Sequence, residues 1–129
     1  MDSVWVARLL VSAFFAVLFL QSGVDKVVDW GGNLGWLKGH FEKSPLRSVV
    51  PLLLGTITLV ELAAGVVSAV GVYMVLSHGS SQVPVMGLAL AGLALVMLFT
   101  GQRIAKDYPG AATLATYFGV VLIGLYISR

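Results

Sequence analysis

Four long apolar runs separated by short polar links dominate the chain. They lie near residues 4–24, 51–74, 83–100 and 111–127. Crossing a hydrocarbon core of about 30 Å takes roughly 17–25 helical residues, and each run meets that length. The pattern predicts an all-α fold, an integral membrane four-helix bundle in which residues 1–129 form a single transmembrane domain.

The link after the first run is too polar and too rich in glycine to cross a bilayer. It still carries apolar side chains at helical spacing, at Trp30, Leu34, Leu37 and Phe41, which predicts a short interfacial helix. Four glycines in the same stretch weaken a helix. A partly irregular, re-entrant or partner-contacting loop is therefore an equal alternative.

Composition supports lipid as the main solvent of this chain. Apolar residues make up 58% of it and charged residues 11%, a balance unlike that of soluble domains. The chain has no cysteine, so it carries no disulfide, Cys-ligated cluster or thiol relay of its own. The net charge of +2 indicates no nucleic-acid partner. The first run has no basic segment ahead of it, which predicts that it is retained and not cleaved as a signal peptide.

The distribution of basic residues predicts the orientation. Two links lie on one side of the membrane and hold Lys26, Lys38, Lys43, Arg47, Arg103 and Lys106. The other side holds only Arg8 and Arg129. Because cytoplasmic loops carry an excess of lysine and arginine, both termini are expected outside the cytoplasm.

Glu61 is the only charged side chain in residues 48–77. A carboxylate near the bilayer centre costs at least about 2.5 kcal/mol, so it is expected to face protein and to mark a functional site. Small side chains share its helix face between Thr58 and Ser68, as they do where another helix approaches closely. Glu61 is therefore expected to be buried between helices.

One face of the first helix carries charged, polar and aromatic side chains in register. Steps of three and four residues relate Arg8, Ser12, Phe15, Phe19, Ser22 and Lys26. Arg8 is the expected counter-charge of Glu61, and Tyr117, in the middle of the fourth run, is an expected hydrogen-bond donor to it. Two interpretations stay open. The pair fixes helix packing, or it lines a quinone-head or proton pocket.

Two charged clusters lie at the ends of spans. The first is expected to be a solvated interfacial cluster and consists of Asp25, Lys26 and Asp29. The second is a candidate contact with a partner subunit and consists of Arg103, Lys106 and Asp107.

Haem and metal ions are not expected to be bound by this chain. His40 and His78 fall in links on opposite sides of the membrane, whereas a bis-histidine haem needs facing imidazoles at similar depth. The carboxylates are scattered along the chain and form no ligand set. No Ser-His-Asp arrangement or nucleotide fingerprint is present either.

Three stretches of the chain are informative because of their order and spacing along the sequence. They read ARLLVSAFFAVLFLQSGVDK in the first helix, ELAAGVVSAVG in the second, and GQRIAKDYPGAATLATYF at the start of the fourth. Together they resemble the DoxX-like family of small four-helix membrane proteins. Arg8, Lys26 and Glu61 correspond to the arginine, lysine and glutamate of the family pattern.

The resemblance implies an association with membrane redox systems such as terminal quinol oxidases. It implies a bacterial inner-membrane protein that contacts lipid and larger subunits of a respiratory or other redox complex. In this interpretation the chain is an accessory subunit, more a structural component than an enzyme, and helps to shape a quinone or lipid site. Without cysteine, its electron carrier would come from a partner or from the quinone pool.

Two other functions remain open at this point. In a stand-alone quinone-reactive component, Glu61 would exchange protons with a bound quinol while Arg8 polarises its oxygen. A small transporter is the third possibility. Four spans lack the inverted repeats and paired broken helices that usually build transport sites, which disfavours it.

Overall fold

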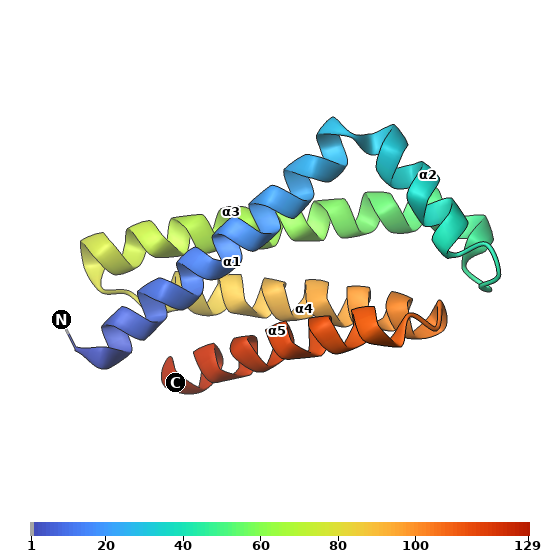
Figure 1. The fold of residues 1–129 in the computed structure, drawn as a ribbon. Coiled ribbons are helices and arrows are strands. Elements are labelled where there is room, and N and C mark those ends of the chain that lie inside the picture. Colours follow the sequence, from blue (N-terminus) through green and yellow to red (C-terminus); the bar gives the residue numbers. More distant parts are fainter. Residues whose placement is uncertain (1) are drawn as a thin grey trace.

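The computed structural model describes residues 2–129, and these residues fold into helices without strands (Figure 1). The helices are α1 (Ser3–Val28), α2 (Trp30–His40), α3 (Val50–His78), α4 (Gln82–Ile104) and α5 (Tyr108–Ile127), with a short 3-10 turn, η1 (Arg47–Val49), before α3. Within this described part, four helices are long and apolar enough to cross a membrane. The predicted all-α fold with four spans is confirmed, and each helix extends beyond its predicted apolar run.

The first link forms a helix, α2, so the alternative of an irregular or re-entrant loop is wrong. A position at the membrane interface and contact with a partner stay predictions. Helix α2 doubles back from the end of α1 toward the start of α3 (Figure 1). Asp29 begins it as an N-cap, because its carboxylate accepts a hydrogen bond from the Gly32 backbone N at 3.3 Å. Leu34 and Leu37 pack against the core of the bundle. The four glycines are therefore tolerated because capping and packing offset their low helix propensity.

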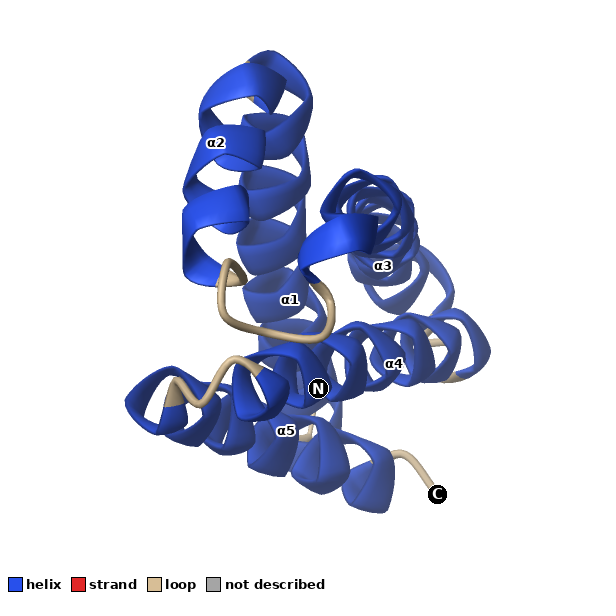
Figure 2. Ribbon diagram, turned by 90° about the vertical axis from the view of Figure 1, so that its right-hand side faces the viewer, coloured by secondary structure: helices blue, strands red, loops and turns tan. Residues whose placement is uncertain are grey.

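The four long helices pack in the order α1, α3, α4, α5, and the first and last of them make only a few contacts with each other. Helix α3 packs along α1 on one side and α4 on the other, α5 packs mainly on α4, and α1 touches α5 only sparsely. Figure 2 shows this arrangement from the end of the bundle that carries α2 and the α4–α5 turn. Both termini lie at the same end of the bundle (Figure 1). The opposite end carries α2 and the α4–α5 turn.

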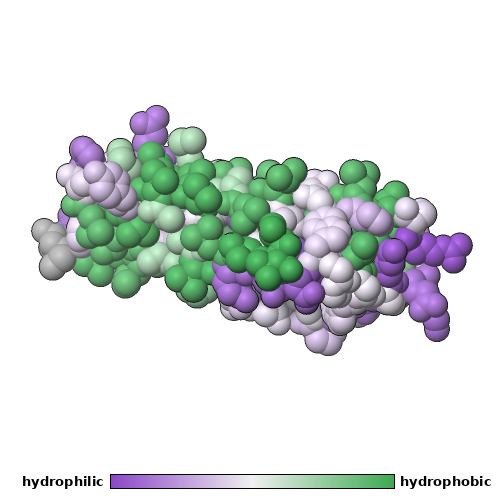
Figure 3. Space-filling model, turned by 90° about the horizontal axis from the view of Figure 1, so that it is seen from above, coloured by the Kyte–Doolittle hydropathy of each residue, from purple (hydrophilic) through white to green (hydrophobic). Residues whose placement is uncertain are grey.

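The core is built from one face of each long helix. Phe15 and Phe19 of α1, Leu54 of α3 and Leu95 of α4 are almost wholly inaccessible. The predicted face of α1 is therefore the buried one. Apolar side chains also cover much of the outer surface, over most of the length from the termini to the middle of the molecule (Figure 3). An apolar exterior is what a lipid environment permits.

Helices α1 and α3 approach closely because glycines replace side chains where they cross. A Cβ atom added at Gly65 would lie 2.8 Å from the backbone N of Leu20, and one at Gly23 would lie 2.6 Å from Leu62 Cδ2. Both distances are too short for real carbon contacts. The expectation that a small-residue face of α3 admits another helix is confirmed, and that helix is α1.

This contact makes a test of the fold. We expect Gly65→Ala to lower the free energy of unfolding by about 1–3 kcal/mol, because the new methyl group meets the α1 backbone and cannot be relieved by a rotamer change. Thermal unfolding of the purified protein in detergent measures the loss. Gly119→Ala is the matched control, since no atom lies within 4 Å of its added Cβ. Equal stability of the two variants would contradict the close helix crossing.

Candidate functional site

The single carboxylate of the second span forms a buried ion pair with Lys26. Lys26 Nζ lies 2.9 Å from Glu61 Oε1, and the two side chains are 15% and 1% exposed. Lys26 Nζ also donates a hydrogen bond to Ser22 Oγ at 2.8 Å, one turn earlier on α1. The expectation that Glu61 is buried between helices is confirmed.

The antiparallel crossing of α1 and α3 brings these two charges together. Gly23 lies against Leu62, which places the last turn of α1 beside the middle of α3. Apart from the Lys26 ammonium at 2.9 Å, Glu61 Oε1 has no polar partner within residues 2–129. The ammonium group is therefore what makes burial of this carboxylate tolerable.

Arg8 is not the counter-charge of Glu61, which corrects the prediction from helix periodicity. Arg8 and Lys26 share a face of α1, but eighteen residues separate them, or about 27 Å of helix. The Trp5 indole donates a hydrogen bond to the Val75 carbonyl at 3.2 Å, which fixes the start of α1 beside the end of α3. Periodicity identified the correct face of α1, and only the helix register selects which cation meets the carboxylate.

The interfacial cluster predicted around Lys26 is divided in the structure. The Lys26 side chain turns inward to Glu61 and leaves its two acidic neighbours. Asp29 caps α2, and Asp25 Oδ2 accepts a hydrogen bond from Asn33 Nδ2 at 3.4 Å. The prediction of a solvated cluster is therefore wrong for Lys26, whereas both aspartates are exposed.

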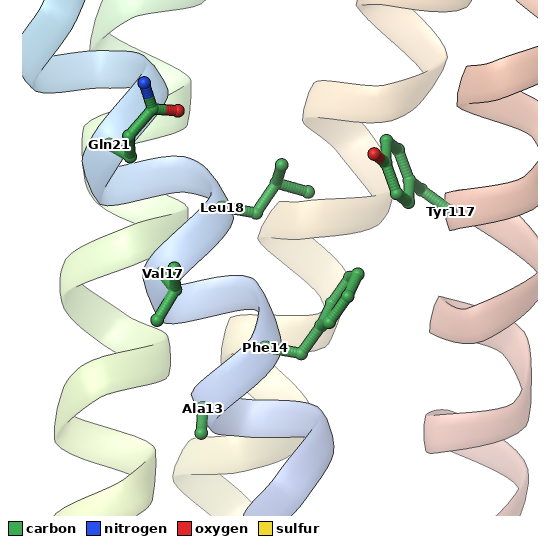
Figure 4. Close-up of a pocket in the computed structure, with 6 residues that line it drawn as sticks. All are labelled: Ala13, Phe14, Val17, Leu18, Gln21 and Tyr117. Carbon is green, nitrogen blue, oxygen red and sulfur yellow. The ribbon is translucent and has the colours of Figure 1, made fainter.

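Tyr117 lies in a groove between α1 and α5 and makes no contact of hydrogen-bond length with Glu61, so that predicted pairing is wrong. Its ring centroid lies 6.0 Å from that of Phe14 across the gap between the two helices. The groove has a volume of about 480 Å³. It is lined by Ala13, Phe14, Val17, Leu18, Gln21 and Tyr117 (Figure 4).

Two polar side chains face this otherwise apolar groove from opposite walls. Gln21 comes from α1 and Tyr117 from α5 (Figure 4), and within residues 2–129 neither side chain makes a hydrogen bond. Both can donate and accept hydrogen bonds, and a bilayer core offers no water to satisfy them. The groove can therefore bind a lipid-soluble molecule that has a hydrogen-bonding head.

Sequence reasoning missed Gln21, although a signal was present. Gln21 is an uncharged polar residue inside the first apolar run, next to Ser22 but off the face that carries Arg8 and Lys26. A polar side chain outside the buried face of a membrane helix marks a surface with its own hydrogen-bonding requirement. That surface is the α1–α5 groove.

The charged residues around the end of α4 organise the end of the bundle opposite the termini. The Arg103 guanidinium lies over the Tyr108 ring, 4.4 Å from its centroid. Asp107 Oδ1 caps α5 by accepting from the Gly110 backbone N at 3.0 Å. Lys106 adopts a left-handed φ of 63° between them. Contact of Arg103, Lys106 and Asp107 with a partner subunit stays a prediction.

The two histidines are the last residues of α2 and α3 and lie at opposite ends of the bundle. His40 Nε2 is 2.7 Å from Gln102 Oε1 and 3.8 Å from Asp107 Oδ2, so it joins α2 to the α4–α5 turn. His78 Nδ1 lies 2.6 Å from Ser77 Oγ at the end of α3. Among residues 2–129, no group of three histidine or carboxylate side chains is placed to hold a metal ion.

The fold and the ion pair define a class: a small multi-pass α-helical membrane protein with a buried charge pair between its first two spans. Comparison of the chain with protein-family models, curated proteins and solved structures finds no match. The resemblance to DoxX-like proteins therefore rests on the three sequence stretches alone.

The ion pair predicts a strong energetic coupling. We expect Glu61→Gln or Lys26→Met alone to destabilise the protein by about 3–5 kcal/mol, because each leaves an uncompensated buried charge. The double variant should lose much less than the sum of the two. Unfolding in detergent, analysed as a double-mutant cycle, measures the coupling.

A second cycle provides the control. Arg8→Met combined with Glu61→Gln should give additive effects, because the two side chains lie far apart along α1 and α3. If the effects were additive in the Lys26 cycle and coupled in the Arg8 cycle, Arg8 and not Lys26 would be the partner of Glu61.

Proposed function

We propose that this chain is a DoxX-like accessory subunit of a bacterial membrane redox complex and that its α1–α5 groove helps to shape a quinone site. The observation that carries the proposal is the groove itself, because two polar side chains without hydrogen-bond partners in residues 2–129, the exposed Gln21 and the half-buried Tyr117, lie along an open apolar groove between spans. The three sequence stretches that resemble the family support the assignment to a redox complex.

The residues of the groove fit a quinone head. Ring carbonyl oxygens accept hydrogen bonds, and both the Tyr117 hydroxyl and the Gln21 carboxamide can donate them. Phe14 offers an aromatic surface for the ring, and the remaining wall is aliphatic, as an isoprenoid tail requires. The volume of about 480 Å³ falls within the roughly 300–1,000 Å³ of ordinary ligand sites.

In this proposal the Lys26–Glu61 pair has a positioning role. It does not line the groove, but it holds the last turns of α1 on α3. Gln21 directly precedes Ser22, which bonds Lys26. The pair therefore sets the position of the α1 wall relative to the rest of the bundle.

The stand-alone quinone-reactive alternative loses its proposed mechanism. It requires Arg8 and Glu61 at the same quinol, whereas Glu61 is paired with Lys26 and Arg8 lies about 27 Å of helix away from that lysine. No observation in residues 2–129 favours the transporter. The accessory subunit is the interpretation that uses both the groove and the pair.

Purification from native membranes in mild detergent tests the accessory role. We expect larger subunits of a redox complex to migrate with the chain, identified by mass spectrometry, and quinone to be extracted from the same particle. A monomeric chain without co-purifying subunits would contradict the accessory role. Its quinone content would then decide whether the groove binds quinone independently.

The groove makes its own prediction. Tyr117→Phe and Gln21→Leu should each weaken binding of a short-chain quinone about fivefold, because each removes a hydrogen bond worth about 1 kcal/mol. Titration of the protein in lipid nanodiscs measures the dissociation constants. Tyr108→Phe is the control on the same helix, since Tyr108 is exposed and outside the groove. Unchanged affinity in both groove variants would remove the quinone from this site.

A further inference from the structure

A single histidine joins the end of α2 to the α4–α5 turn. His40 is the last residue of α2, and its Nε2 atom lies 2.7 Å from Gln102 Oε1 and 3.8 Å from Asp107 Oδ2. Both oxygens are acceptors, so Nε2 carries a hydrogen and donates to the nearer one, Gln102. The contact of His40 with Gln102 and Asp107, called the His40 contact below, bridges 62 positions of the sequence.

The strength of the His40 contact depends on whether the imidazole is protonated. A neutral ring donates one hydrogen bond to Gln102, whereas an imidazolium also forms an ion pair with Asp107, whose Oδ2 is already within reach at 3.8 Å. Histidine side chains gain and lose this proton between about pH 5 and 8. The two side chains are 16% and 30% exposed, so protons from water reach the ring.

The carboxylate of Asp107 is the charged group that meets His40 from the α4–α5 turn. Two cations belong to the same turn. Arg103 lies over the Tyr108 ring, 4.4 Å from its centroid, and Lys106 is exposed. Within residues 2–129, the ion pair of His40 is with Asp107, so protonation of the ring acts on this carboxylate.

The charged groups of the other elements around α2 are turned to water or paired elsewhere. The charged residues of α2, of η1 and of the segment between them are exposed, namely Lys38, Glu42, Lys43 and Arg47. Helix α3 packs on α2, and its carboxylate, Glu61, pairs with Lys26. Asp25 and Asp29 form their hydrogen bonds at the opposite end of α2. None of these groups replaces Asp107 as the partner of His40.

Helix α2 is the helix whose docking depends most on this contact, because none of its residues is buried. An element with few buried contacts opens more readily than the rest of a fold. The His40 ring is held in place by Trp36, stacked at a centroid distance of 4.6 Å, and by Phe41, edge-on at 5.2 Å. Phe41 itself is buried, and a Cβ atom added at Gly101 would lie 3.5 Å from its ring. Fixed neighbours on both sides keep the imidazole beside Asp107.

We propose that the His40 contact is a pH-sensitive switch that controls how tightly α2 docks on the α4–α5 turn. Protonation adds the ion pair with Asp107 and tightens the docking. By linkage, α2 is held most tightly at low pH and opens more often as the pH rises and the proton leaves. The switch is separate from the α1–α5 groove, whose lining includes none of the three residues.

Hydrogen exchange of the α2 amides tests the switch directly. The full chain in lipid nanodiscs is exchanged at about pH 5.5 and about pH 8, on either side of the range in which histidine titrates. Exchange rates are converted to protection factors, which removes the intrinsic dependence of amide exchange on pH. We expect protection over residues 34–41 to be about threefold higher at the lower pH, since a partly exposed ion pair contributes roughly twofold to fivefold.

Three variants assign the effect to the His40 contact. Asp107→Asn removes the charge but retains the side-chain oxygen that caps α5 by accepting from Gly110 N, and His40→Gln retains a neutral donor. Both should abolish the pH dependence of α2 protection. His78→Gln is the matched control, because it removes the other histidine, at the opposite end of the bundle, and should keep the threefold change. A pH dependence that persists in Asp107→Asn, or that disappears in His78→Gln, overturns the proposal.

Two further measurements keep the test decisive. If His40→Gln fails to dock α2 at either pH, Asp107→Asn still carries the test, because its α2 protection at about pH 8 should equal that of the wild type, in which the ring is then neutral. Nuclear magnetic resonance of the two histidine rings, assigned with His78→Gln, gives the titration of His40. The change in α2 protection should follow that titration, and a change over a different pH range would contradict the switch.

Discussion

The close crossing of α1 and α3 is the constraint on which the rest of the structure depends. Glycine at positions 23 and 65 lets the two backbones meet, and this contact brings Lys26 to within 2.9 Å of Glu61. Neither feature is stable alone. A buried carboxylate without its ammonium is costly, and the ammonium reaches it only because no side chains separate the helices. The close glycine contact and the neutralisation of Glu61 by Lys26 therefore depend on each other within the α1–α3 interface.

Much of the fold follows from the sequence, because its signals are local. Length and apolarity predict the four spans, and the three- and four-residue periodicity predicts the buried face of α1, with Phe15 and Phe19 at its centre. The single carboxylate predicts that Glu61 faces protein. Its partner is not predictable in the same way. Arg8 and Lys26 lie on one face, and choosing between them requires the register of α1 against α3, which tertiary packing determines.

The groove shows a second limit of sequence reasoning. Tyr117 was expected beside Glu61 because a phenol in mid-span needs a partner, yet α5 packs mainly on α4 and meets α1 only sparsely. The gap left by this loose seam holds Tyr117 and Gln21. Periodicity describes the face that a helix buries, whereas a groove lies where two helices fail to pack. The residues of the groove therefore come from two helices, from the edge of the buried face of each, and no single helical periodicity in the sequence connects them.

The two cations of α1 show how depth decides the role of a charge in a membrane protein. Lys26 stands in the last turn of α1, yet the crossing brings it against the middle of α3, where it pairs with a carboxylate of the same chain. Arg8 stands near the other end, where Trp5 bonds the end of α3, and it forms no ion pair within residues 2–129. The same face of α1 thus carries a lysine that is paired with Glu61 near one end of the helix and an arginine whose Nε has no hydrogen-bond partner near the other. The difference arises from the antiparallel register, because that register alone determines which surroundings each side chain meets.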